Sequence, residues 1–92
     1  MSMDKKAYKV FYQHPRGGYR IVAEIYATSL EDVFYQMQGE VWSPNGEMRD
    51  YILSKGLRHT SMMVGDIALD VKTGKAWICA DFGWDEFKGC KR

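Results

Sequence analysis

Cysteine, histidine and proline are scarce in this sequence, and it has no long apolar run. Its 92 residues include two cysteines, two histidines and two prolines. Two cysteines are too few for a disulfide framework, and neither Cys79 nor Cys90 has the close cysteine or histidine neighbour of a zinc site. No apolar stretch approaches the roughly 20 residues that span a bilayer, and no secretion signal opens the chain. We therefore expect no metal, no cofactor, no membrane contact and a cytoplasmic location.

A large excess of charge is also missing. Thirteen lysines and arginines face twelve aspartates and glutamates, which gives a net charge of +1. Proteins that grip DNA through many phosphates usually carry a clear positive excess. Apolar residues make up 46% of the chain, which argues against disorder. The length suits a single domain over residues 1–92, and we expect residues 1–5 and 88–92 to be flexible tails.

The N-terminal part predicts a β-hairpin. Over residues 7–13, Tyr8, Val10 and Tyr12 alternate with more polar positions, although Phe11 interrupts the polar face. A turn with proline and two glycines follows, and residues 19–27 read as the second strand. On that strand we expect one face to carry Ile21, Ala23 and Ile25.

The middle of the chain predicts two helices. Thr28 and Glu31 have the spacing of a capping box, and the apolar period then changes to that of a helix over residues 29–38. Gly39 is a natural helix stop. After a turn with proline and an Asn-Gly pair, a second helix is expected over residues 47–55, ending at Gly56.

The last third predicts two more strands, over residues 67–71 and 75–82, joined by a tight turn. The aromatic residues that follow, Phe82, Trp84 and Phe87, are expected to cover an edge of the core. The order along the chain is then β-β-α-α-β-β. The simplest architecture is α+β, with one mostly antiparallel sheet of about four strands and two helices on one face.

Two unusual segments carry the leading functional hypothesis. Residues 41–47 place a tryptophan in a tight turn, and residues 59–66 place hydroxyls and thioethers ahead of Val-Gly-Asp. For the segments themselves we favour a structural role, in which Trp42 fills the core and Gly65 and Asp66 turn the chain into its strand. The functional alternative is that the two segments meet and form a surface for a protein partner, because tryptophan, methionine and arginine are enriched at interface hot spots. The expected contact residues are Trp42, Asn45, Arg58, His59, Met62 and Trp84.

Two other functions are alternatives. Basic residues and tyrosines gather along the first hairpin, and aromatic side chains on a sheet can stack nucleic-acid bases. The residues of this alternative are Lys9, Tyr12, Arg16, Tyr19 and Arg20. A small hydrolase would centre on His59, Ser61 and Asp66, but their close spacing does not establish a catalytic triad, and we assign no catalytic residue. An enzyme is the less favoured reading.

The two unusual segments also carry a resemblance. They resemble a group of short uncharacterised proteins of bacteriophages, plasmids and other mobile elements, which pair a Trp-Ser-Pro-Asn-Gly-Glu turn with a Leu-x-His-Thr-Ser-Met-Ser-Val-Gly-Asp stretch. A Gly-aromatic ending like Gly83-Trp84 follows in that group, and the second segment is more distantly similar to YodL-like domains. The resemblance covers roughly residues 38–87, and Met63 stands where the group usually has serine.

The resemblance implies a phage or plasmid origin and the cytoplasm of a host cell, but no particular activity. Together with the residues above, it predicts a non-enzymatic interaction module that engages a host protein. A homodimer is a further alternative, because an exposed sheet edge such as the first strand would let two copies pair across a two-fold axis.

Overall fold

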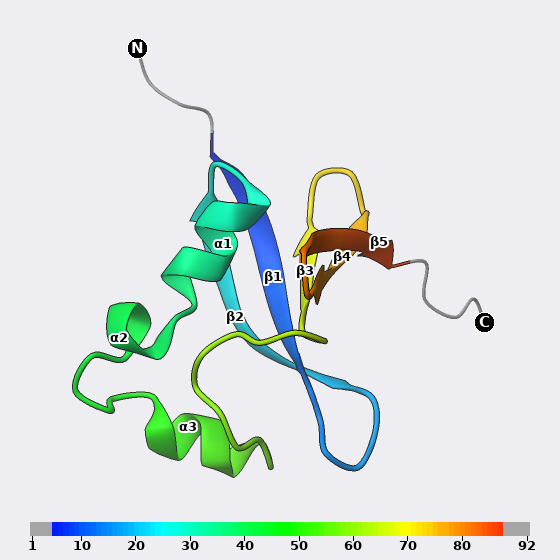
Figure 1. Ribbon diagram of the computed structural model, residues 1–92. Coiled ribbons are helices and arrows are strands. Elements are labelled where there is room, and N and C mark those ends of the chain that lie inside the picture. The colour runs from blue at the N-terminus through cyan, green and yellow to red at the C-terminus, as the bar shows by residue number, and fades with distance from the viewer. Residues whose placement is uncertain (1–4, 88–92) are drawn as a thin grey trace.

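The computed structural model describes residues 5–87, and these residues form an α+β fold with a five-stranded antiparallel sheet and three short helices. Figure 1 shows the helices gathered on one side of the sheet. The expected tails lie outside the described residues, except for Lys5, and so does Cys90. The elements in chain order are β1 (Lys6–Gln13), β2 (Tyr19–Ala27), α1 (Leu30–Gln36), α2 (Gly39–Trp42), α3 (Arg49–Ser54), β3 (Ile67–Asp70), β4 (Ala76–Ala80) and β5 (Gly83–Phe87).

The first hairpin is confirmed, but one of its faces differs from the prediction. Strands β1 and β2 pair antiparallel, and Tyr8, Val10 and Tyr12 are buried as their alternation predicts. The register shifts between Val10 and Phe11, so that Val22 is the extra residue of a β-bulge. Val22 therefore turns into the core at 3% exposure, whereas Ile21 is 39% exposed. The prediction was therefore wrong at Ile21, because alternation breaks at a bulge, whereas Ala23 and Ile25 do pack against the core.

The first helix begins one residue later than the capping pattern suggested. Ser29 is the N-cap, and its hydroxyl accepts a hydrogen bond from the Asp32 amide at 3.1 Å. The Asp32 carboxylate in turn accepts from the Thr28 amide at 3.0 Å. Ser29 is therefore the capping residue in place of Thr28, and Asp32, in place of Glu31, reaches back to the residue before the cap.

The middle segment holds one helical turn that was not expected. Gly39 does not end the helical region, because it is the first residue of the short helix α2. Helix α3 then starts after Met48, whose amide donates to the Ser43 hydroxyl at 2.9 Å. Gly56 has a φ of +77°, which suits its role in ending this helix.

The C-terminal part of the chain has one more strand than predicted. Strands β3 and β4 form the expected hairpin, but β5 adds a fifth strand that pairs with β4 from Ala76–Phe87 to Ala80–Gly83. Trp84 and Phe87 thus belong to the sheet itself. The polar residues Asp85 and Glu86 hide the strand pattern, which is typical of an edge strand with one free side.

The sheet order is β2-β1-β3-β4-β5, and it places β1 between two neighbours. The expectation that the first strand is a free edge was therefore wrong, and β2 and β5 are the edge strands instead. Strand β1 pairs antiparallel with β3, and in this register Val10 lies opposite Ala68 and Phe11 lies opposite Ile67.

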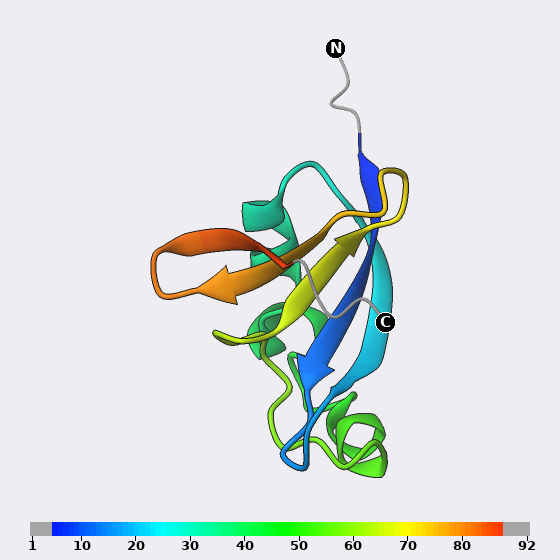
Figure 2. The same ribbon diagram turned by 90° about the vertical axis from the view of Figure 1, so that its right-hand side faces the viewer.

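The main core lies between the helices and one face of the sheet. Tyr8, Val10 and Tyr12 from β1 meet Val33 of α1 and Ile52 of α3 in one hydrophobic cluster. Figure 2, turned by 90° from Figure 1, shows strands of the sheet in front of α1. No helix within residues 5–87 has the length and hydropathy needed to cross a bilayer.

Candidate functional site

The two unusual segments do lie against one another. The Trp42 indole nitrogen donates to the Thr60 carbonyl at 3.0 Å, and the Gly39 amide donates to the Ser61 hydroxyl at 2.7 Å. The Met62 amide bonds to the Met37 carbonyl at 3.1 Å. Each of these bonds satisfies a backbone group of a loop or helix end, so the contact fastens residues 57–66 to the helices.

A buried carboxylate fastens the same loop to the sheet. Asp66 is 1% exposed, and it accepts hydrogen bonds from the Gln13 amide at 2.9 Å and the Met63 amide at 2.8 Å. The His59 Nε2 atom lies 3.1 Å from the second Asp66 oxygen and must carry the proton, because an ionised carboxylate only accepts. The His59 ring also stacks on Tyr12, with centroids 4.9 Å apart.

These contacts give His59 and Asp66 a structural role. The hydroxyl of Ser61, the third residue of the hydrolase alternative, accepts a hydrogen bond from the Gly39 amide. Within residues 5–87 it makes no hydrogen bond with His59. A nucleophile and its base must lie within hydrogen-bond reach. The thiol of Cys79 is no better suited as a nucleophile. Burial, then the charges of Asp66 and Asp81, raise the pKa of Cys79, and the reactive form of a cysteine is the thiolate. No group of three metal-ligating side chains occurs within residues 5–87.

The six expected contact residues do not form one outer surface. Met62 is 1% exposed and belongs to the core, and Trp42 and Trp84 pack partly buried against it. Asn45 is exposed, but its amide and side chain bond within the turn to Glu47. Arg58 is exposed and His59 half-buried.

The open face of the sheet carries the apolar surface that those residues lack. We use this name for the side chains on the face turned away from the helices, and register places them opposite one another: Lys9 with Leu69, Phe11 with Ile67, Leu69 with Ala76, and Ala76 with Phe87. In Figure 2 no described helix crosses this face. The uncovered face of an antiparallel sheet is usually polar, so this composition is unusual.

A groove of about 240 Å³ lies on the open face. It is lined by Phe11, Tyr19, Ile67, Leu69, Ala76 and Phe87. The rings of Tyr19 and Phe87 meet edge to face with centroids 5.8 Å apart, which joins the first hairpin to the last strand. Ile67 is buried at 4% exposure and the other lining side chains are partly buried, so the groove offers a limited apolar surface.

The residues of the nucleic-acid alternative are divided between places. Tyr12 is fully buried with its hydroxyl bonded to backbone carbonyls, so it offers no ring for stacking. Lys9 and Tyr19 lie on the open face. Arg16 lies on the hairpin turn, where it lines a pocket with His14, and the Arg20 guanidinium lies close to Gly18 of the same turn.

Sequence reasoning missed the open face and the approach of residues 56–58 to the hairpin turn. Phe11 was the available signal for the first, since it interrupts an otherwise polar strand face. Leu69 and Phe87 gave none, because only the sheet order aligns them with Phe11. At the turn, Gly56 and Arg58 come from a distant segment, and nothing local connects them to His14.

Comparison of the chain with protein-family models, with curated proteins and with solved structures gives no match.

Proposed function

We propose that the chain is a non-enzymatic protein-interaction module of a bacteriophage or other mobile element, and that a host protein docks on its open face. The observation that carries this proposal is the apolar groove between Phe11, Leu69 and Phe87 on the uncovered side of the sheet. Burial of such surface supplies roughly 25 cal/mol for each Å² removed from water, so an uncovered apolar face favours association.

The expected partner presents aliphatic or aromatic side chains. The groove is lined by apolar side chains and Tyr19, and the charged residues near it are of both signs. Lys9 and Glu24 lie opposite one another on β1 and β2, and Asp85 lies on β5. A mixed rim gives no strong preference for a charged partner, so specificity would come from the shape of the groove.

The other surfaces support this function less well. The loop surface around Trp42 is held by the hydrogen bond from its indole to Thr60 and by the burial of Met62. The exposed residues there include the apolar Val41, Met63 and Val64, but none of these three side chains lines the apolar groove.

The test compares a double variant with a matched control. Phe11→Thr combined with Leu69→Thr makes the groove polar while keeping side chains that suit a strand. Phe82→Thr removes an aromatic ring that is 100% exposed but lies outside the groove. A protein captured from host lysate by the wild type and by Phe82→Thr, but lost with the double variant, would be purified and titrated.

Hydrogen exchange in the purified complex then locates the contact. We expect new protection on β1, β3 and β4, and affinity reduced at least about tenfold by the double variant. Protection confined to α3 or the loops would overturn the proposal, and so would equal affinity of all three proteins. A solution mass of two chains that the double variant abolishes would assign the open face to a second copy instead.

A further inference from the structure

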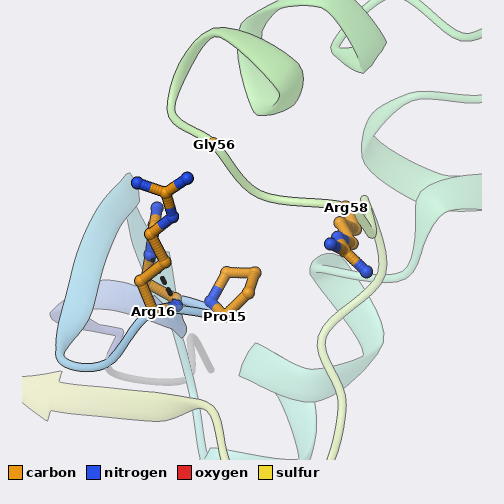
Figure 3. Close-up of a pocket in the computed structure, with 5 residues that line it drawn as sticks. Pro15, Arg16, Gly56 and Arg58 are labelled. Atoms are coloured by element: carbon orange, nitrogen blue, oxygen red, sulfur yellow. Dashed lines mark hydrogen bonds between the residues drawn. The ribbon is translucent and has the colours of Figure 1, made fainter.

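A second site lies at the turn of the first hairpin, and it shares no lining residue with the groove of the open face. A pocket of about 390 Å³ is lined by His14, Pro15, Arg16, Gly56 and Arg58. Figure 3 shows Arg16 and Pro15 on the hairpin turn, and Arg58 on a separate segment at the other side of the pocket. Two segments about forty residues apart therefore contribute one arginine each.

The positive charge around this pocket is uncompensated. Within residues 5–87, the ion pairs are Lys6 with Asp70 and His59 with Asp66, so neither Arg16 nor Arg58 has a carboxylate partner. Arg20 adds a third cation close to the turn, since its charge reaches His14. A chain with a net charge of only +1 thus concentrates unpaired cations at one place.

The His14 ring in the pocket is held in place by Arg16 and Gly56. The Arg16 amide donates to His14 Nδ1 at 3.0 Å, so the neutral ring carries its proton on Nε2. Gly56 lies against that atom, and a Cβ there would approach Nε2 to 2.6 Å. Partial burial, followed by the charges of Arg20 and Arg16, lowers the pKa of His14. The His14 ring therefore tends to remain neutral beside the guanidinium groups of Arg16 and Arg20.

We propose that this pocket binds the phosphoryl group of a phosphorylated ligand, with Arg16 and Arg58 as the charged donors and the His14 ring in its lining. Arginine presents paired N–H donors that match the oxygens of a phosphate, and such charge-assisted bonds are about twice as strong as neutral ones. The pocket is independent of the open face, because the two share no lining residue.

Titration of the full chain with inorganic phosphate, followed by NMR of the His14 ring, tests the proposal. Phosphate that replaces chloride at constant ionic strength is expected to shift the His14 signals and to raise the His14 pKa, because a bound anion favours the imidazolium. Arg16→Gln and Arg58→Gln are each expected to weaken phosphate binding about fivefold to tenfold.

Arg49→Gln is the matched control, because Arg49 is exposed and does not line the pocket. It removes the same charge and is expected to change affinity less than about twofold. The proposal is overturned if His14 does not respond to phosphate, or if Arg49→Gln weakens binding as much as Arg58→Gln.

A 5′-mononucleotide and a short single-stranded oligonucleotide distinguish the sources of the phosphoryl group. Equal affinity for inorganic phosphate and both nucleotides assigns the site to an isolated phosphoryl group. Affinity that grows with strand length and falls steeply with salt assigns it to a nucleic-acid backbone. All three variants replace exposed side chains, and their thermal unfolding shows whether the fold is retained.

Discussion

The two faces of the sheet come from alternate residues of the same strands but meet different surroundings. Val10 points to the helices and is fully buried, while its neighbour Phe11 points to the open face. On the covered face the buried polar groups are also hydrogen-bonded, as the three hydrogen bonds of Asp66 show. On the open face the side chains around the groove are mostly apolar and no described helix covers them. Alternation distributes apolar residues to both faces, and only the helices decide which face becomes a core.

One of the two largest expected effects tests the polar network of the covered face. Asp66→Asn keeps the volume of the side chain but removes the charge that the Gln13 and Met63 amides share with His59. We expect it to lower the free energy of unfolding by about 3 kcal/mol, because the NH2 group of Asn sets a donor against the N–H donors that Asp66 satisfied, and buried groups left without a partner are costly. Denaturant unfolding at neutral pH measures the change. A loss below about 1 kcal/mol would show that the loop 57–66 is held mainly by its apolar contacts.

A neighbouring pair of methionines separates burial from sequence position. Met62 is 1% exposed and Met63 is 51% exposed. Met62→Ala is expected to cost about 2 to 4 kcal/mol, because it leaves a cavity in the core. Met63→Ala is expected to stay within about 0.5 kcal/mol of the wild type. The two midpoints of chemical unfolding give the comparison, and similar losses would contradict the assignment of Met62 to the core.

Alkaline pH probes the covered face through Tyr12. Burial, then the charge of Asp66, raise the pKa of Tyr12 well above its usual value of about 10. The folded chain keeps this proton at a pH where the unfolded chain has lost it, so stability falls as the pH rises above about 10. Tyr12→Phe is expected to cost about 1 kcal/mol at neutral pH, because the hydroxyl no longer bonds to the Thr60 carbonyl.

The same variant is expected to flatten the alkaline slope in unfolding curves recorded over a series of pH values. Tyr8, whose pKa burial also raises, accounts for part of the slope that remains. An unchanged slope would show that Tyr12 ionises in the folded state, against its burial.

Local signals predicted the elements that depend on neighbours in sequence. The first hairpin, the first helix and the hairpin of β3 and β4 follow from periodicity and turn residues, and the structure confirms them. The capping pattern was displaced by one residue, because Thr28 and Ser29 are both residue types that cap helices. In the structure Ser29 caps the Asp32 amide, while the Asp32 carboxylate accepts from the Thr28 amide. The bulge at Val22 and the strand β5 depend on pairing partners, which periodicity does not contain.

The candidate sites were harder to predict for the same reason. The groove needs Phe11, Leu69 and Phe87 from three strands, and their alignment follows from the order β1-β3-β4-β5. The phosphoryl pocket needs Arg58 to approach the turn at Arg16, which depends on where α3 ends. Sequence reasoning noticed Trp42 and Met62 because they are unusual, and the structure uses both for packing.

The smallest expected effect decides whether the open face is free. Phe11→Thr alone is expected to cost at most about 1 kcal/mol, because its side chain is only partly buried and threonine suits a strand. Phe82→Thr, at a fully exposed position, is expected to change nothing beyond about 0.5 kcal/mol. Parallel denaturant unfolding of both variants gives the comparison. A loss near 3 kcal/mol for Phe11→Thr would mean that this face is a second core, and a second core has no apolar surface to offer a partner.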